Sequence, residues 1–235
     1  MSRFTRKIKQ RPSEPIEVII LGAGVGARIK SYEPRSLIKI RNKALIDHQI
    51  EFINKYIPKN SITLVVGYDA NKIIKKVYGK VKIVENQIYN ESNNAESLRL
   101  AINNSSIQQA IVMHGDLYFE DSLFNHFDFR ESFIFTSSLF NSKEVGVTVV
   151  DGYATIFSYA LITKWAQIVF LAEKELNILR KIYLKDEDMK YNLTFEMLNK
   201  IMESGGQFRA IDIKNSYIKE IDTIKDITDE NTNRY

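Results

Sequence analysis

The first half of the chain alternates between short apolar runs and segments of helical spacing, and this alternation constrains the fold more than any other feature. Apolar runs of this length predict buried strands, whereas apolar residues at i, i+3, i+4 and i+7 predict helices. Strands are expected at residues 17–21, 62–66, 81–85 and 110–114. Helices are expected between them at residues 46–56, 69–78 and 95–102. A β-α-β succession of this kind favours a mostly parallel sheet with helices on both faces.

The rhythm changes after about residue 130. Short β-rich runs are expected at residues 132–140, 146–150 and 153–159, and the pair Asp151–Gly152 is the strongest hairpin signal in the chain. Helical runs are expected near residues 161–182 and at 193–203, the latter ended by Gly205–Gly206. This layout suits a ligand-binding first half and a small β-rich and helical insertion that shapes a substrate pocket.

Length and composition bound the class of protein. A chain of 235 residues with 44% hydrophobic and 26% charged residues can bury a sizeable core, and single α/β domains of this length are common. We expect a flexible tail at residues 1–15 and a single domain at 16–235. The tail holds much of the basic excess behind the net charge of +4, in Arg3, Arg6, Lys7, Lys9 and Arg11.

Several classes of function are disfavoured. Such a basic tail can touch nucleic acid or an anionic membrane, but a solvated leader is the commoner interpretation, and no nucleic-acid-binding signature follows it. The chain has no apolar run long enough to span a membrane and no secretion signal, so we expect a cytoplasmic protein. The absence of cysteine excludes disulfides, zinc–thiolate sites and cysteine nucleophiles.

Three glycines follow the first expected strand. Gly22, Gly24 and Gly26 lie where open parallel sheets bind their ligands, and without side chains their amides can approach phosphate oxygens. The spacing of these glycines also fits a dinucleotide fingerprint, and a glycine-rich turn between strand and helix can be purely structural. The glycines alone therefore indicate an anion site without naming its ligand.

The residues after the glycines favour a triphosphate. A dinucleotide site needs a long helix directly after the loop and an acidic residue about twenty positions further on. Here Pro34 interrupts any helix, and Arg28 and Arg35 lie close to the loop. Each guanidinium can present a fork of donors to phosphate oxygens and can stabilise charge that develops at phosphorus.

Five motifs in a fixed order resemble one enzyme family. "LGAGVGAR", then five residues, then "PRSL" resembles the signature L-A-A-G-x-G-x-R followed by P-K-x-L of nucleotidyltransferases that activate sugar phosphates, choline phosphate and related alcohol phosphates. "VGY" at 66–68 and "NQIYNESNNAESLRLA" from Asn86 resemble segments of the cytidylyltransferase-like branch. "MHGDLYF" at 113–119 and "IKEIDTIKDI" at 218–227 resemble the segments that supply the metal carboxylates. The resemblance spans about residues 17 to 227.

The resemblance implies a Rossmann-like α/β fold and transfer of a nucleoside monophosphate from an NTP to a phosphorylated small acceptor, with release of pyrophosphate. It implies nucleotide-binding residues at Leu21, Gly22, Ala23, Gly24, Gly26, Arg28, Tyr68, Asn94 and Ser97. Arg28 and Arg35 would be catalytic, and Mg²⁺ would be held by Asp116, Asp222 and Glu220. CTP is the preferred donor, with UTP or dTTP as alternatives, because the segment around Asn94 resembles the cytidylyltransferase branch. A homodimer is the default expectation.

Two departures from the family pattern leave alternatives open. Arg35 stands where the signature has lysine. The planar guanidinium of arginine and the compact ammonium group of lysine contact phosphates differently, so the exchange can alter or abolish activity. A catalytically silent nucleotide-binding protein of the same fold is therefore one alternative. A nucleotide-sugar glycosyltransferase is another, but it would be expected to show a D-x-D metal motif, and "HGDLYFED" fits nucleotidyl transfer better.

The acceptor pocket is the second departure. Relatives that take choline phosphate surround its ammonium group with aromatic rings and a carboxylate. Trp165 lies in the expected helix, where a core role is the simpler interpretation, and His114 is expected to pack rather than to take part in chemistry. Other candidates for such a pocket are Tyr153, Phe157, Tyr159, Tyr191, Phe195 and Glu196. A sugar 1-phosphate acceptor would instead need several polar side chains, as the stretch from Asn141 to Glu144 offers.

Overall fold

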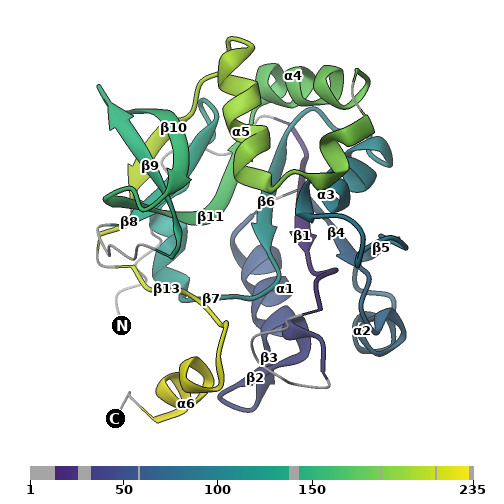
Figure 1. Cartoon of the computed structure of the whole chain (residues 1–235). Helices are drawn as coiled ribbons and strands as arrows, with labels where there is room; N and C mark the ends of the chain where they lie inside the picture. Colours follow the sequence, from purple (N-terminus) through teal and green to yellow (C-terminus); the bar gives the residue numbers. More distant parts are fainter. Residues whose placement is uncertain are drawn as a thin grey trace.

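The computed structural model describes residues 14–25, 33–57, 59–137, 143–185, 187–214 and 216–232. Its centre is a nine-stranded sheet of order β5-β4-β1-β6-β11-β8-β12-β10-β9 (Figure 1). The strands of this sheet are β1 (Ile16–Leu21), β4 (Asn60–Val66), β5 (Lys82–Glu85), β6 (Ala110–His114), β8 (Phe133–Ser137), β9 (Val145–Val150), β10 (Tyr153–Tyr159), β11 (Thr163–Leu171) and β12 (Arg209–Asp212). Two small antiparallel sheets pair β2 (Lys39–Ile40) with β3 (Lys43–Ala44) and β7 (Leu117–Phe119) with β13 (Ile218–Glu220).

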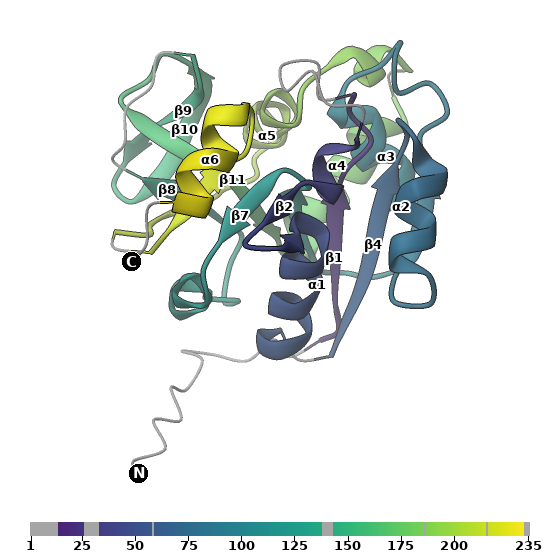
Figure 2. The ribbon, with the colours of Figure 1, turned by 90° about the horizontal axis from the view of Figure 1, so that it is seen from below.

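Helices cover both faces of the large sheet, as the sequence predicts. One face packs against α1 (Leu45–Tyr56) and α2 (Ala70–Val77). The opposite face packs against α3 (Asn94–Asn103), α4 (Glu173–Tyr183) and α5 (Thr194–Glu203). Figure 2 shows α1 and α3–α5 on opposite sides of the strands. The remaining elements are three 3-10 helices, Arg35–Leu37, Asp121–His126 and Glu187–Tyr191, and α6 (Ile224–Thr232), which packs near β2.

The first four strands place the ends of β1 and β6 side by side. All the pairings within β5-β4-β1-β6 are parallel, and Val18 of β1 lies opposite Ile62 of β4 and Ile111 of β6. Every residue of β1 is buried because helices cover both faces, which explains the apolar run from Val18 to Leu21, while the buried Glu17 accepts a hydrogen bond from Thr63. The chain continues from β1 to β4 on one side and later to β6 on the other, so the strand order reverses at β1. Open α/β sheets bind ligands beyond the strand ends at such a point.

Local signals in the second half are confirmed. The turn Asp151–Gly152 joins antiparallel β9 and β10, with φ of 51° and 84° as a two-residue type I′ hairpin requires. Helix α5 ends where the glycine pair predicts. Gly205 has a φ of +87°, its N–H donates to the carbonyl of Met202, and the Gly206 N–H donates to that of Ile201. This is the Schellman arrangement of a glycine-terminated helix.

The helix expected near residues 161–182 is wrong over its first half. Residues Thr163–Leu171 form β11, which lies between β6 and β8, and helix α4 begins only at Glu173. Both faces of β11 are buried, with Phe170 facing one core cluster and Val169 the other. An apolar run buried on both faces lacks the alternation of a half-exposed strand, so its periodicity does not distinguish it from a buried helix. Trp165 therefore belongs to a strand.

Gly67 gives a direct test of the close packing at the end of β4. An added Cβ at Gly67 would lie 2.7 Å from the Cβ of Tyr89 and 2.8 Å from the carbonyl oxygen of Ala23. Gly67→Ala should therefore shift these groups and lower the free energy of unfolding by about 1–3 kcal/mol, measured by urea denaturation. Gly24→Ala is the matched control because an added Cβ there meets no atom within 4 Å. Equal free energies of unfolding for Gly67→Ala and Gly24→Ala would contradict the close packing around Gly67.

Candidate active site

A cavity of about 440 Å³ opens beyond the ends of β1 and β6, at the point where the strand order reverses. The loop Leu21–Gly24 forms one wall and helix α3 another. The strand β11 and the start of α5 close the remaining sides. The first half of the chain thus supplies the loop, and the second half supplies much of the opposite wall, in the layout that the sequence predicts.

The glycine loop is fixed by backbone hydrogen bonds to both neighbouring strands. The Gly22 N–H donates to the carbonyl of Val65 at 2.9 Å, and the Gly115 N–H donates to that of Leu21 at the same distance. An added Cβ at Gly22 would lie 3.3 Å from the Val65 oxygen, so the loop fits tightly beside β4. Leu21, Gly22, Ala23 and Gly24 all line the cavity. The predicted residues Gly26 and Arg28 lie outside the described residues.

Three predicted carboxylates meet at the base of the cavity. Asp116 follows β6, whereas Glu220 and Asp222 lie at and just after the end of β13. Antiparallel pairing of β13 with β7 places Glu220 opposite Leu117, and the Ile221 N–H donates to the Asp116 carbonyl at 2.9 Å. One oxygen from each carboxylate lies within 4.8 Å of the other two. Such a cluster of oxygen donors can hold a divalent cation.

Arg35 reaches into this carboxylate cluster from the short 3-10 helix Arg35–Leu37. Its Nη1 lies 2.6 Å from Asp116 Oδ2 and 2.7 Å from Asp222 Oδ1. The closest oxygen of Glu220 is 3.9 Å away. Burial lowers the pKa of Arg35, but the negative charges of Asp116 and Asp222 outweigh it, so the net shift is upward and the guanidinium stays charged.

Burial governs the protonation of the groups around the cluster. It raises the pKa of Glu220 to about 8, and the negative charges of Asp116 and Asp222 add to that shift. The amide of Gln167 donates to Glu220 and opposes it. Burial also lowers the pKa of His114, which keeps this imidazole neutral. Below about pH 8, Glu220 therefore carries a proton while no metal is bound.

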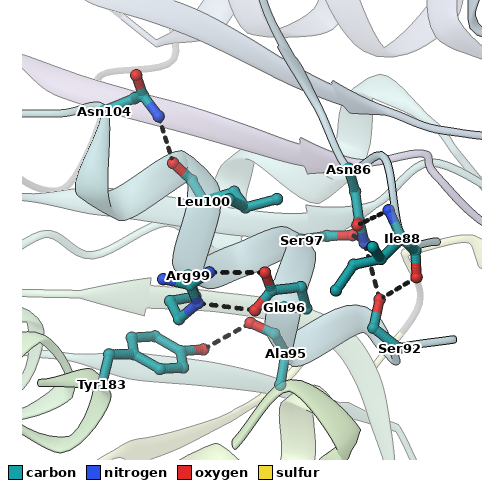
Figure 3. Close-up of polar contacts among 10 residues, drawn as sticks. All are labelled: Asn86, Ile88, Ser92, Ala95, Glu96, Ser97, Arg99, Leu100, Asn104 and Tyr183. Atoms are coloured by element: carbon teal, nitrogen blue, oxygen red, sulfur yellow. Dashed lines mark hydrogen bonds and ion pairs between the residues drawn. The ribbon is translucent and has the colours of Figure 1, made fainter. Parts of the chain in front are cut away.

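Helix α3 begins at the cavity and is held by a polar network (Figure 3). The buried Asn86 side chain donates to the hydroxyls of Ser92 and Ser97 at 3.2 and 3.1 Å. Its Oδ1 accepts from the Ile88 N–H. Asn94 lines the cavity while its Oδ1 accepts from the Thr194 N–H at 2.7 Å, which ties α3 to α5. The predicted residues Asn94 and Ser97 thus both face the cavity.

Tyr68, unlike the predicted residues Asn94 and Ser97, lies outside the cavity. It does not belong to the cavity lining, and its ring makes an edge contact with Tyr89, which does, at 6.4 Å between centroids. Tyr89, Asn86 and Ser92 line the cavity as well. All three stand in the stretch "NQIYNES", within the segment that resembles the cytidylyltransferase-like branch. That resemblance indicates the correct segment but does not single out these three positions. Tyr89, rather than Tyr68, is the aromatic side chain available to a ligand here.

The far wall contains three aromatic residues and a backbone irregularity. Trp165 and Phe195 are buried and line the cavity together with the half-exposed Tyr159. The register of β11 against β8 shifts between Trp165 and Val169, and Gln167 within this bulge has a φ of +56°. Bulges that re-aim side chains are typical next to active sites. Gln167 lines the cavity, although no pattern in the sequence selects it.

The other residues predicted for an aromatic acceptor pocket do not line the cavity. Phe157 is buried behind Trp165, with ring centroids 5.5 Å apart. Glu196 caps α5 by accepting from the Leu193 N–H at 2.6 Å, and Tyr153 and Tyr191 lie outside the cavity lining. The aromatic lining of this part of the cavity thus consists of Trp165, Tyr159 and Phe195, and Glu144, which pairs with Lys164, lines the cavity as well.

Comparison with curated proteins gives relatives of one kind. Over 116 residues the chain is 32% identical to choline-phosphate cytidylyltransferase from Streptococcus pneumoniae, covering 47% of this chain and 49% of that protein. Over 141 residues it is 28% identical to a bifunctional sugar-1-phosphate nucleotidylyltransferase/acetyltransferase from Sulfurisphaera tokodaii, covering 58% and 34%. The chain is similar to nucleotidyltransferases over about half of its length. It spans about half or less of the length of these relatives, and no protein-family model matches it.

Solved structures confirm the fold. CTP:phosphocholine cytidylyltransferase from Streptococcus pneumoniae superposes with a TM-score of 0.72 over 91% of this chain and 96% of that one, at 23% identity. The inositol-1-phosphate CTP transferase from T. maritima gives a TM-score of 0.73 over 92% of each chain, at 18% identity. The predicted α/β architecture with helices on both faces is thus confirmed as that of nucleotidyltransferase structures. Within the described part of the chain, no helix has the length and apolar character needed to cross a bilayer.

The raised pKa of Glu220 predicts a specific pH dependence of stability. Between pH 4.5 and about 8 the folded state keeps a proton on Glu220 that the unfolded chain releases, so raising the pH through this window removes stability. The stability of the wild type relative to Glu220→Gln should therefore decline from pH 5 to pH 8.5. Urea unfolding at several pH values, in the presence of a chelator, measures this difference.

The control for this measurement is Glu51→Gln, which removes an exposed carboxylate on α1 far from the cluster. A stability difference between wild type and Glu220→Gln that stays constant across the window would contradict the raised pKa of Glu220.

Proposed function

We propose that the protein is a Mg²⁺-dependent nucleotidyltransferase that transfers a nucleoside monophosphate from an NTP to a phosphorylated small acceptor and releases pyrophosphate. The observation that carries this proposal is the meeting of Asp116, Glu220 and Asp222 in the cavity that the glycine loop also lines. A loop suited to phosphates beside an all-oxygen cation site is the combination that phosphoryl and nucleotidyl transfer requires.

The carboxylate cluster fits Mg²⁺ by its chemistry. All three donors are carboxylate oxygens, which suit this cation, and Asp116 Oδ1 is buried without a hydrogen-bond partner among the described residues. A bound Mg²⁺ would neutralise negative charge on the reacting phosphates. Asp116 and Asp222 would be its principal ligands, with Glu220 as a third ligand or an orienting neighbour.

The protein's own groups perform the positioning. Ala23 and Gly24 line the cavity, and their amides can donate to phosphate oxygens of the NTP, whereas the Gly22 N–H is bonded to Val65. Arg35 contacts the carboxylates and lines the same cavity as the loop, so its fork of donors can stabilise charge that develops on phosphate during transfer. The in-line approach of acceptor phosphate to the α-phosphorus is favoured when both substrates are held in one cavity.

CTP is the donor we propose, with UTP or dTTP as the alternatives. The polar residues Asn86, Asn94 and Ser97 and the ring of Tyr89 form the wall next to the loop, where a base and ribose can lie. The support for cytidine comes from relatives whose names specify it, the choline-phosphate cytidylyltransferase and the inositol-1-phosphate CTP transferase.

An acceptor with a cationic head fits the far wall best. Trp165, Tyr159 and Phe195 offer ring surfaces to an ammonium group, and Glu144 adds a carboxylate at the same wall. We therefore favour an alcohol phosphate of the choline phosphate kind. A sugar 1-phosphate is the second candidate because Gln167, Lys143 and Thr194 also line the cavity and offer polar contacts.

Pyrophosphate release tests the activity and names both substrates. The protein is incubated with Mg²⁺ and each NTP, with and without choline phosphate, ethanolamine phosphate or a panel of sugar 1-phosphates. Release should require one NTP and one acceptor, and Asp116→Ala should lower the rate by at least about 10²-fold because a charge-stabilising group is lost. Nucleotide binding without release for any pair, or full activity in Asp116→Ala, would contradict the proposal.

Arg35 motivates the second candidate, a catalytically silent nucleotide-binding protein of the same fold. Arg35→Lys separates the two, because lysine restores the residue of the family signature but removes the planar fork that contacts two carboxylates. In a working enzyme adapted to arginine, kcat should fall on the order of 10²-fold. A large gain of transfer activity in Arg35→Lys would instead show that the wild type is degenerate.

A further inference from the structure

Arg35 occupies the centre of the site that a divalent cation would need. Its single Nη1 atom contacts Asp116 and Asp222 at 2.6 and 2.7 Å, and Glu220 follows at 3.9 Å. The four side chains are largely shielded from water, with exposed fractions of 21% for Arg35 and 13–19% for the carboxylates. Within the described residues, this one guanidinium thus contacts two of the three carboxylates and offsets part of the negative charge of the cluster.

A guanidinium and a metal ion cannot use this position together. Mg²⁺ binds oxygen at about 2.0–2.1 Å, so its ligand oxygens must converge to roughly twice that distance or less. The cluster oxygens, within 4.8 Å of one another, are close to that spacing already, and Nη1 lies among them. Two positive groups sharing the same oxygens in a poorly hydrated pocket would repel each other strongly.

We propose that Arg35 is an internal counter-ion of the carboxylate cluster and competes with the divalent cation for it. The inference rests on the proposed function, because it concerns the metal site of that reaction. In the ligand-free protein the guanidinium keeps the carboxylates together. Entry of the cation displaces the Arg35 side chain, which then becomes available to the phosphates of the incoming nucleotide.

The local structure allows the side chain to move while its backbone stays in place. Backbone hydrogen bonds from Leu37 to Pro34 at 2.9 Å and from Ile38 to Arg35 at 3.0 Å fix the 3-10 turn that carries Arg35. The Arg35 side chain has one hydrogen-bond donor left unused, because its buried Nε has no partner among the described residues. A phosphate oxygen would supply the missing acceptor and favour the displaced position.

The identity of the residue matters to this competition. A guanidinium stays protonated at every accessible pH, so it competes with the metal regardless of pH. The residue is also the one point in "PRSL" where the chain departs from the P-K-x-L signature that it resembles. The competition is therefore a property of this chain's own residue.

Metal affinity measured without nucleotide tests the inference directly. Mn²⁺ binding, followed by the EPR signal of free Mn²⁺, should be at least tenfold tighter in Arg35→Met than in the wild type. Arg130→Met is the matched control, because Arg130 is 56% exposed, pairs with Asp128 and lies outside the cavity lining. Its Mn²⁺ affinity should equal that of the wild type.

The outcomes distinguish the two proposals. Equal or weaker Mn²⁺ binding in Arg35→Met overturns the competition and leaves the proposed function in place, provided that the wild type binds Mn²⁺. Absence of Mn²⁺ binding in every variant overturns the competition together with the metal site of the proposed function.

Thermal stability provides a second measurement that remains informative if Arg35→Met is poorly stable. Without its internal cation, the variant should melt several degrees below the wild type in a chelator, because the negative charges of Asp116 and Asp222 then repel each other with no guanidinium between them. Added Mn²⁺ should raise the melting temperature of Arg35→Met more than that of the wild type, since a ligand that binds the folded state more tightly stabilises that state more. An equal rise in both proteins overturns the competition.

Discussion

The electrostatic cost of holding three carboxylates together is the constraint on which this site depends. Asp116, Glu220 and Asp222 share a pocket that water reaches poorly, and like charges so placed are stable only beside a cation or with a proton on one of them. The structure shows both solutions at once. Arg35 contacts two of the carboxylates, and the pKa of Glu220 is raised to about 8. A cluster balanced in this way is ready to exchange its cation.

The sheet determines where that cluster lies. The parallel pairing of β1 with β4 and β6 brings the glycine loop and the start of the Asp116 segment to the same edge of the sheet. The antiparallel pair of β7 and β13 then returns the end of the chain to this edge, with Glu220 opposite Leu117. The bulge in β11 completes the cavity by presenting Trp165 and Gln167 from the far wall. The glycine loop, the carboxylate cluster and the aromatic residues thus meet in one cavity.

Some parts of this arrangement could be predicted residue by residue and others could not. The strand at β1 and the hairpin at Asp151–Gly152 follow from local patterns, because burial of a strand and the twist of a tight turn restrict residue types directly. The sequence predicts a helix around Trp165, which is wrong because a strand buried on both faces shows no alternation of apolar and polar residues. Tyr68 and Tyr89 show the same limit at the site, since only packing decides which of two neighbouring rings faces the cavity.

The sequence by itself predicted a glycine loop after a buried strand and arginines close behind it, and through the family resemblance it indicated acidic residues in two later segments. These are local patterns, and each residue type can be weighed from its neighbours in the chain. Only the tertiary structure decided that the Arg35 guanidinium contacts the carboxylate of Asp116, 81 positions away, and that of Asp222. The reason is that such contacts depend on strand pairing between distant segments, where the register of β13 on β7 sets which charges become neighbours.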